Sequence, residues 1–163
     1  MEKQVTLTYN EYRAIAAKIK PNGQAFIDGK FCDAADGQKF ETINPATGQV
    51  LASVAHCKSV DVDRAVKAAR RVFNAGTWSR AEPEERKEVL LKVASLVREN
   101  TPELAVLESL DTGKTINDCM DEIGGEVVNF FQWYAELADK SFGKIAPTGP
   151  SALALIVKEP AGV

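Results

Sequence analysis

The chain has 163 residues, of which 45% are hydrophobic and 26% charged, and a formal net charge of −3. This length and mixture suit one ordinary globular domain and exclude a disordered or fibrous chain. The slight negative charge gives no electrostatic basis for binding nucleic acid. The longest apolar run is far too short to span a bilayer, so we expect no membrane partner.

The first third of the chain predicts a short helix and two hairpins. Residues 8–20 carry apolar side chains at helical spacing, and Pro21-Asn22-Gly23 ends that helix. Asp28-Gly29 lies between two short β-rich runs, which is a strong signal for a tight hairpin. A second hairpin is expected where residues 44–48, Asn-Pro-Ala-Thr-Gly, form the turn.

The middle of the chain changes to a period of about 3.6, which predicts four helices. The first takes Ser59 as N-cap and ends at Gly76. The second begins at Pro83, and the third runs from Thr101 to Asp111-Thr112-Gly113. The fourth is the longest and contains Gly124-Gly125, which predicts a close neighbour or a bend.

Each of these helices has an apolar stripe that we expect to be buried. The stripes comprise Val62, Ala65, Val66, Ala69, Val72 and Phe73, then Val89, Leu90, Val93, Ala94 and Val97, then Leu104, Leu107 and Leu110. The stripe of the fourth helix comprises Ile116, Met120, Ile123, Val127, Phe130, Phe131, Tyr134, Leu137 and Ala138.

The end of the chain predicts two strands, residues 144–146 and 153–157, around a turn rich in proline and glycine. A natural domain rarely finishes on an unpaired apolar strand, because its free backbone groups invite aggregation. We therefore expect these residues to be the front part of a longer protein.

Few residues of the chain suggest a catalytic or metal-binding role. The three cysteines, Cys32, Cys57 and Cys119, are an odd number, which favours a protein of the reducing cytoplasm. They lack the spacing of metal ligands, and His56 is the single histidine, so we expect no zinc site. Cys57 lies beside His56 and is the best candidate nucleophile, but we expect all three cysteines to pack as small apolar side chains. Asp111-Thr112-Gly113-Lys114 resembles the tail of a phosphate loop, yet it follows a helix, so Gly113 is read as a left-handed cap.

Acidic residues recur on the fourth helix. Asp118, Glu122 and Glu126 lie four residues apart with Asp121 beside them, and no Lys or Arg within the stripe relieves their repulsion. One interpretation is an ordinary solvated face. The other is an acidic wall that meets a cation in a partner or substrate.

Six segments together resemble the opening of NAD(P)-dependent aldehyde dehydrogenases, most of all the γ-glutamyl-γ-aminobutyraldehyde dehydrogenase type. Each is weak alone, but they occur in the family's order from about Gln24 to Val163. They are Phe26-Ile27-Asp28-Gly29-Lys30, Asn44-Pro45-Ala46-Thr47-Gly48, the run from Val62 to Arg70, the run from Leu107 to Lys114, Trp133-Tyr134-Ala135 with Ala138-Asp139-Lys140, and Lys158-Glu159-Pro160-Ala161-Gly162-Val163.

The resemblance implies an α/β fold, seen here as the N-terminal part of the aldehyde dehydrogenase fold with two β-hairpins, four helices and the start of an oligomerisation hairpin. Residues 1–23 would be an N-terminal arm and residues 24–140 part of the cofactor-binding domain. Residues 141–160 would be the oligomerisation hairpin and residues 161–163 the start of the dinucleotide-binding core.

The resemblance also implies a function for the complete protein, the oxidation of aldehydes, including amino-aldehydes from polyamine breakdown, to carboxylic acids with NAD or NADP. The family's catalytic cysteine and glutamate would lie beyond Val163, so this segment alone would be inactive and would bind no cofactor. Its partners would be the remainder of the same enzyme or a second copy, in a homo-oligomer (dimer or tetramer).

Two sites are implied by the resemblance. The Thr42 backbone and the Asp111 carboxylate match a structural site for a monovalent cation, with oxygen ligands that suit a hard ion. Asp121, Glu122 and Glu126 would line the substrate entrance and face the positive end of an amino-aldehyde.

Two other interpretations remain open at this point. The chain could be a free-standing interaction module that adds Ser151–Val157 as a strand to a partner sheet. It could also be a cleaved piece that stays docked on its other half.

Overall fold

The computed structural model describes residues 7–163, so the first six residues of the expected N-terminal arm lie outside the described part. The helices are α1 (Tyr9–Ala16), α2 (Ser59–Ala75), α3 (Pro83–Glu99), α4 (Thr101–Thr112), α5 (Ile116–Asp121), η1 (Glu122–Val127) and α6 (Val128–Leu137). The strands are β1 (Ala25–Ile27), β2 (Lys30–Cys32), β3 (Lys39–Ile43), β4 (Val50–Ala55), β5 (Lys144–Ala146) and β6 (Ala154–Ile156).

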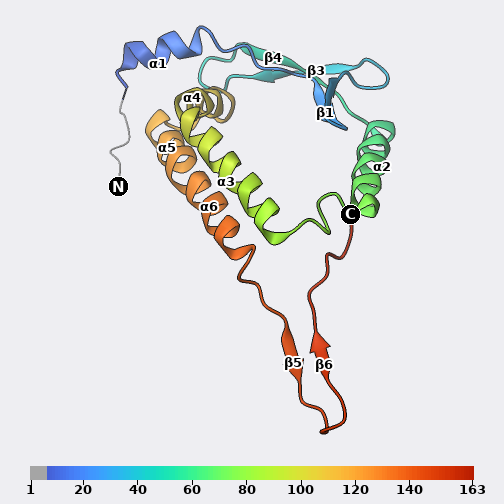
Figure 1. Ribbon diagram of the computed structural model, residues 1–163. Coiled ribbons are helices and arrows are strands. Elements are labelled where there is room, and N and C mark those ends of the chain that lie inside the picture. Colours follow the sequence, from blue (N-terminus) through green and yellow to red (C-terminus); the bar gives the residue numbers. More distant parts are fainter. Residues whose placement is uncertain (1–6) are drawn as a thin grey trace.

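The described chain forms an open ring with one projecting arm (Figure 1). Helices α3 to α6 lie side by side, the first two hairpins cross one end of them, and α2 stands apart on the opposite side. The strands pair only within three antiparallel hairpins, β1–β2, β3–β4 and β5–β6, in the described residues. The expected mixed architecture is therefore confirmed.

The predicted helix start and tight turn at the beginning of the chain are confirmed. Thr8 and Glu11 form a reciprocal capping box at the start of α1. Asp28 and Gly29 have φ angles of +54° and +75°, as a two-residue hairpin turn between twisted strands requires. The rings of Phe26 and Phe31 pack edge to face across this hairpin, with centroids 5.0 Å apart.

Helix α2 begins one residue differently from the prediction. Lys58, not Ser59, is the N-cap, and the carboxylate of Asp61 accepts a hydrogen bond from the Lys58 amide at 3.2 Å. The same carboxylate accepts from the Ala35 amide at 3.0 Å and from Arg64 at 3.2 Å. Asp61 is only 3% exposed, so it fastens the loop after β2 to the start of α2.

The apolar stripe of α2 is not buried, contrary to expectation. Val62, Val66 and Val72 are exposed, because β1 is the main element of the described chain that packs against this helix. The spacing of these apolar residues is that of a helix that packs one face against a hydrophobic core. Residues 7–163 form no hydrophobic core against that face of α2.

The small core lies among the other helices. Ala94 of α3 and Ala135 and Val128 of α6 are buried where these two helices pack together. A second cluster joins α4 to α5, and it contains Ala105, Cys119 and Met120. Five residues from the predicted stripes of these helices are exposed instead, namely Val89, Leu104, Phe130, Tyr134 and Leu137. Ala105 and Val106 take the buried positions of α4.

The fourth predicted helix is interrupted at its two glycines. Residues Glu122–Val127 form a π-helical turn between α5 and α6, with Gly124-Gly125 at its centre. A methyl group added at Gly125 would meet nothing within 4 Å, so no neighbour in the described chain requires glycine there. At the glycine pair the hydrogen-bonding pattern of the helix changes locally from α to π.

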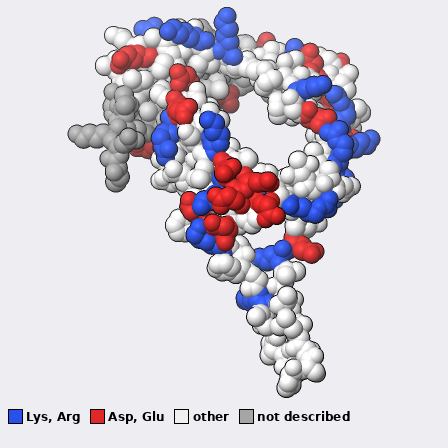
Figure 2. Space-filling view, in the orientation of Figure 1, with Lys and Arg blue, Asp and Glu red and all other residues white. Residues whose placement is uncertain are grey.

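The last two strands pair with each other and form an arm that projects from the body (Figure 1). Strand β6 is thus not unpaired, which corrects the expectation for the end of the chain. At the base of the arm, Lys158 donates to the hydroxyl of Ser141 at 2.9 Å, and Gly143 lies so close to Ile156 that a Cβ would meet its carbonyl oxygen at 2.5 Å. Most side chains of the arm, including Ile145 and Leu155, are exposed, and Figure 2 shows almost no charge beyond its base.

A charge cluster joins α3 to α6 above the arm. Lys87, whose side chain is 18% exposed, lies 3.1 Å from Glu136 and 3.6 Å from Asp139. Lys140 contacts the same two carboxylates at 3.3 and 2.7 Å. The hydrogen bond from Lys87 is the main reason that the pKa of Glu136 lies below its usual value.

This cluster predicts acid sensitivity that depends on Lys87. Since the pKa of Glu136 is lower in the folded than in the unfolded chain, its stabilising effect is complete above the ordinary value of about 4.3. The effect is lost as the pH falls through the lowered folded pKa. We expect the thermal midpoint, measured from about pH 7 to 3, to fall less steeply in Lys87→Met than in the parent chain. Lys92→Met, on an exposed position of α3, should keep the parental slope, and a parental slope in Lys87→Met would contradict the prediction.

Candidate functional site

The structure brings together two residues that the sequence singled out as cation ligands. The hydroxyl of Thr42 on β3 donates to Asp111 Oδ1, at the end of α4, at 2.6 Å, although 69 residues separate them. Thr42 lies at the point where the β3–β4 register shifts, so the regular ladder is interrupted beside it. Asp111 lies in the last turn of α4, which ends at Thr112 and is capped by Gly113 with a φ of +79°.

This pair lies at the edge of a hollow of about 440 Å³ between the β3–β4 hairpin and the helices α3, α4 and η1. Its walls are mainly apolar, and Glu108 and Asp111 are its carboxylates. The lining residues from the helices are Val97, Leu104, Leu107, Glu108, Asp111, Ile123 and Val127.

The oxygen atoms of the pair fit a weakly bound hard cation. A carboxylate and a threonine oxygen are the donor types that such ions prefer. Within residues 7–163 no group of three or more His, Cys, Asp or Glu side chains could hold a metal ion.

Lys114, which lies outside the acidic stripe, neutralises part of its charge. Its ammonium group lies 2.7 Å from Glu122 and 3.3 Å from Glu108, and so it joins the end of α4 to η1. The hydrogen bond that Lys114 donates to Glu122 is the main cause of a raised pKa at Lys114. Glu122 is therefore part of a compensated pair.

The other acidic residues of the stripe differ in their surroundings. Asp118 lies in the first turn of α5. Its amide donates to the hydroxyl of Thr115, and that hydroxyl donates to the Asp118 carboxylate. Asp121 and Glu126 are exposed, and neither has an ion-pair partner among the described residues. An uncompensated negative charge thus remains at Asp121, just before the π-helical turn, and at Glu126, within it.

The three cysteines differ in their exposure. Cys119 is buried and Cys32 partly buried, as expected for packing residues, but Cys57 is exposed, which corrects the prediction for that residue. Desolvation is the first cause of a raised pKa at both Cys57 and Cys119, and a raised pKa leaves less thiolate at neutral pH.

Sequence reasoning missed the residues that organise this region through long-range contacts. Lys114 reaches Glu122 across a turn, eight residues away, and Lys87 reaches Glu136 on another helix. Neither pair is three or four residues apart, which is the spacing at which side chains meet on one helix face. The one available signal was the isolated Lys114 just before the acidic stripe.

Within residues 7–163, no helix is both long and apolar enough to cross a membrane.

Comparisons with known proteins agree with this fold. The model of the aldehyde dehydrogenase family matches residues 31–163. The chain is 49% identical over 157 residues to aminoacetaldehyde dehydrogenase of Pseudomonas aeruginosa, a match that covers 96% of this chain and 32% of that protein. The chain therefore spans about a third of the length of this curated relative.

Solved structures give the same result. The indole-3-acetaldehyde dehydrogenase of P. syringae, in complex with NAD+, superposes with a TM-score of 0.93 and 39% identity over 96% of this chain and 32% of that one. The γ-glutamyl-γ-aminobutyraldehyde dehydrogenase of Burkholderia cenocepacia gives 0.84 and 44% over 87% of this chain and 29% of that one. Since the family model covers most of the chain and the backbone follows the N-terminal portion of these enzymes, the chain belongs to the aldehyde dehydrogenase family.

Proposed function

We propose that this chain forms the N-terminal part of an enzyme that oxidises amino-aldehydes to carboxylic acids in the cytoplasm. The observation that carries the proposal is the 49% identity to an aminoacetaldehyde dehydrogenase along almost the whole chain. The cytoplasmic location is supported by three free cysteines, which suit a reducing compartment.

The described residues would contribute scaffold and binding surface, and the catalytic cysteine and glutamate would lie in polypeptide outside this chain. In this proposal residues 24–140 belong to the cofactor-binding domain, and bound NAD or NADP would accept the hydride. The complex of the P. syringae relative with NAD+ supports NAD as the cofactor of the complete enzyme.

The arm formed by residues 141–160 is proposed to build a homo-oligomer. Its exposed apolar side chains and the free outer edges of a two-stranded ribbon favour association with another sheet. The Thr42–Asp111 pair is proposed to hold a monovalent cation that ties β3 to α4.

An assay of two proteins tests the proposed activity. The first is the chain itself, and the second is a chimera in which the chain replaces the matched third of the P. aeruginosa relative. With aminoacetaldehyde and NAD+, we expect the chimera to produce NADH and the chain alone to produce none. Turnover by the bare chain, or a folded but inactive chimera, would contradict the proposal.

The acidic residues beside the π-helical turn are proposed to line the substrate entrance. Glu126 and Asp121 are uncompensated, whereas Glu122 is already paired with Lys114, so Glu126 should be the more sensitive position. In the chimera, Glu126→Lys should raise KM for a protonated amino-aldehyde about thirtyfold, since one charge contact near water is worth on the order of 1 kcal/mol and charge reversal counts twice.

The control for this prediction is a neutral aldehyde of the same length, whose KM should change less than about twofold because it carries no charge to repel. Glu103→Lys, an exposed position in the first turn of α4, should leave both KM values unchanged. An equal rise for charged and neutral aldehydes in Glu126→Lys would remove Glu126 from the entrance.

A further inference from the structure

Of the basic side chains in residues 7–163, Lys114 alone forms an ion pair with the acidic stripe. It comes from the short connection between α4 and α5, and its ammonium group lies 2.7 Å from Glu122, the first residue of the π-helical turn. The contact with Glu108 of α4 is longer, at 3.3 Å. Glu122 is therefore the principal partner of Lys114.

The ion pair between Lys114 and Glu122 lies at the surface, where their side chains are 43% and 44% exposed. The hydrogen bonds that Lys114 donates to Glu122 and Glu108 raise its pKa, so it is protonated at neutral pH. An exposed pair of this kind contributes little to stability, because water weakens the attraction. It still changes the charge that an approaching ligand meets.

Lys114 alters the charge that the π-helical turn presents to solvent. Asp121 precedes the turn and Glu126 lies within it, and neither has an ion-pair partner in the part of the chain that the structure describes. Glu122 lies one helical turn before Glu126, a spacing at which side chains are neighbours. The three carboxylates carry three negative charges, and the ammonium group of Lys114 reduces this to a net charge of −2.

We propose that Lys114 is a specificity-determining residue, which masks Glu122 and so limits how strongly the entrance favours aldehydes with two ammonium groups over aldehydes with one. This role rests on the proposed function, in which Asp121, Glu122 and Glu126 line the substrate entrance. Coulomb attraction is proportional to the product of the charges, so each negative charge at the entrance acts twice on a dication. Masking one carboxylate therefore reduces the attraction of a dication twice as much as that of a monocation.

A purely structural role for the same pair predicts a different result. Lys114 also joins α4 to the π-helical turn, so its loss would displace the turn if the bridge held it in place. Displacement of the turn would raise KM for charged and neutral aldehydes alike. Unmasking of Glu122 would instead lower KM for cations and leave neutral aldehydes unaffected, so the sign of the change separates the two roles.

Steady-state kinetics of the chimera test the proposal with three aldehydes. They are a straight-chain aldehyde with one ammonium group, one with two, and the first with its amine acetylated, which makes it neutral. In Lys114→Met, KM should fall about threefold for one ammonium group, the effect of a unit charge one helical turn away in water, and about tenfold for two, because doubling the energy squares the ratio. KM of the neutral aldehyde should change less than about twofold. An unchanged KM for both cations, or a rise for all three aldehydes, would overturn the proposal.

Two variants and a change of salt serve as controls. Lys92→Met removes the same charge from an exposed position on α3 and should leave all three KM values at the parental level. Lys114→Arg keeps the positive charge beside Glu122 and should also behave as the parent does. Because the pair is exposed, the effect of Lys114→Met on the cations should shrink at high ionic strength, and an effect that ignores salt would contradict a role for charge.

A double variant completes the test. Lys114→Met combined with Glu122→Gln removes one positive and one negative charge, so both cationic aldehydes should return to within about twofold of the parental KM. Persistence of the low KM values in the double variant would overturn the masking of Glu122. A folded but inactive chimera would contradict the proposed function and this role with it, whereas an active chimera whose KM values ignore Lys114→Met would contradict this role alone.

Discussion

Replacing Asp61 with alanine should lower the free energy of unfolding by about 3 kcal/mol, because hydrogen bonds to a charged group are each worth roughly 1.5–3 kcal/mol. The carboxylate is buried, and it satisfies the amides of Ala35 and Lys58, which belong to two different segments. Without it, both amides lose their partner and the first turn of α2 is no longer fastened to the loop after β2. Urea unfolding followed by circular dichroism measures the change.

Asp63, two residues further on, provides the control. It is exposed in the same turn of α2, so Asp63→Ala should change the free energy of unfolding by less than about 0.5 kcal/mol. Asp61→Asn keeps one acceptor oxygen and should give an intermediate loss. The same loss in Asp61→Ala and Asp63→Ala would show that only helix-end charge matters, not the bridge between segments.

Gly23→Ala should destabilise the chain by a similar amount, about 3 kcal/mol, through a clash with backbone atoms. A Cβ at Gly23 would lie 1.9 Å from the carbonyl oxygen of Ser53 and 3.1 Å from the Cα of Val54. Both atoms belong to β4, which is held in its ladder with β3, so they cannot turn aside as a side chain would. Residues before β1 would have to move away and break the bond from the Ala55 amide to the Gly23 carbonyl, now 2.7 Å.

The thermal midpoint and the exchange rate of the Ala55 amide measure this effect. Gly149 is the matched control, because a Cβ there meets nothing within 4 Å and its φ angle is not positive. Gly149→Ala should therefore change stability by less than about 0.5 kcal/mol. An unchanged Ala55 amide in Gly23→Ala would mean that the backbone accommodates the methyl group, against the prediction.

Local signals predicted most elements of this chain well. Asp28-Gly29 specified the first hairpin, Pro83 the start of α3 and Gly113 the end of α4, because each depends on the backbone preferences of one or two residues. The start of α2 was misplaced by one residue, since Asp61 binds the Lys58 amide from the third position of the helix and takes the role expected of Ser59.

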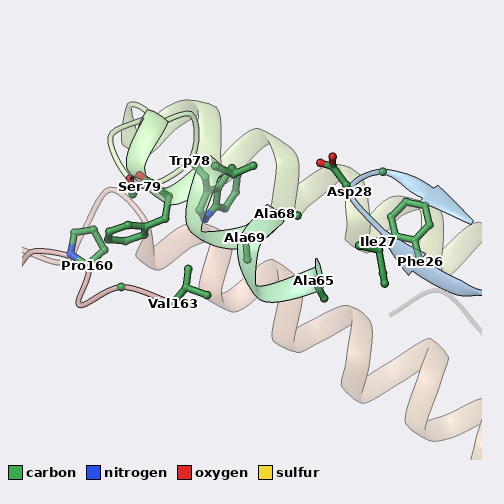
Figure 3. Close-up of a pocket in the computed structure, with 14 residues that line it drawn as sticks. Phe26, Ile27, Asp28, Ala65, Ala68, Ala69, Trp78, Ser79, Pro160 and Val163 are labelled. Carbon is green, nitrogen blue, oxygen red and sulfur yellow. Dashed lines mark hydrogen bonds between the residues drawn. The ribbon is translucent and has the colours of Figure 1, made fainter. Parts of the chain in front are cut away.

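Burial could not be predicted in the same way. An apolar stripe indicates that a helix face packs against a partner, but it does not indicate whether that partner belongs to the same stretch of chain. Part of the stripe of α2 lines a hollow (Figure 3). Thr42 and Asp111 were paired by the family resemblance and not by any spacing, because 69 residues separate them. The period of four in the acidic stripe was also misleading, since the π-helical turn changes the angular position of Glu126 relative to Asp118.

The arm has a consequence for the kinetics and cost of assembly. Its two strands are already paired with each other, and Gly143, Ser141 and Lys158 fix its root within the chain itself. Ordering a backbone costs roughly 1–2 kcal/mol per residue, and here that entropy is lost during folding of the chain itself. Association through the arm would then resemble the meeting of two rigid bodies, with a rate set by diffusion and orientation and not by a slow folding step.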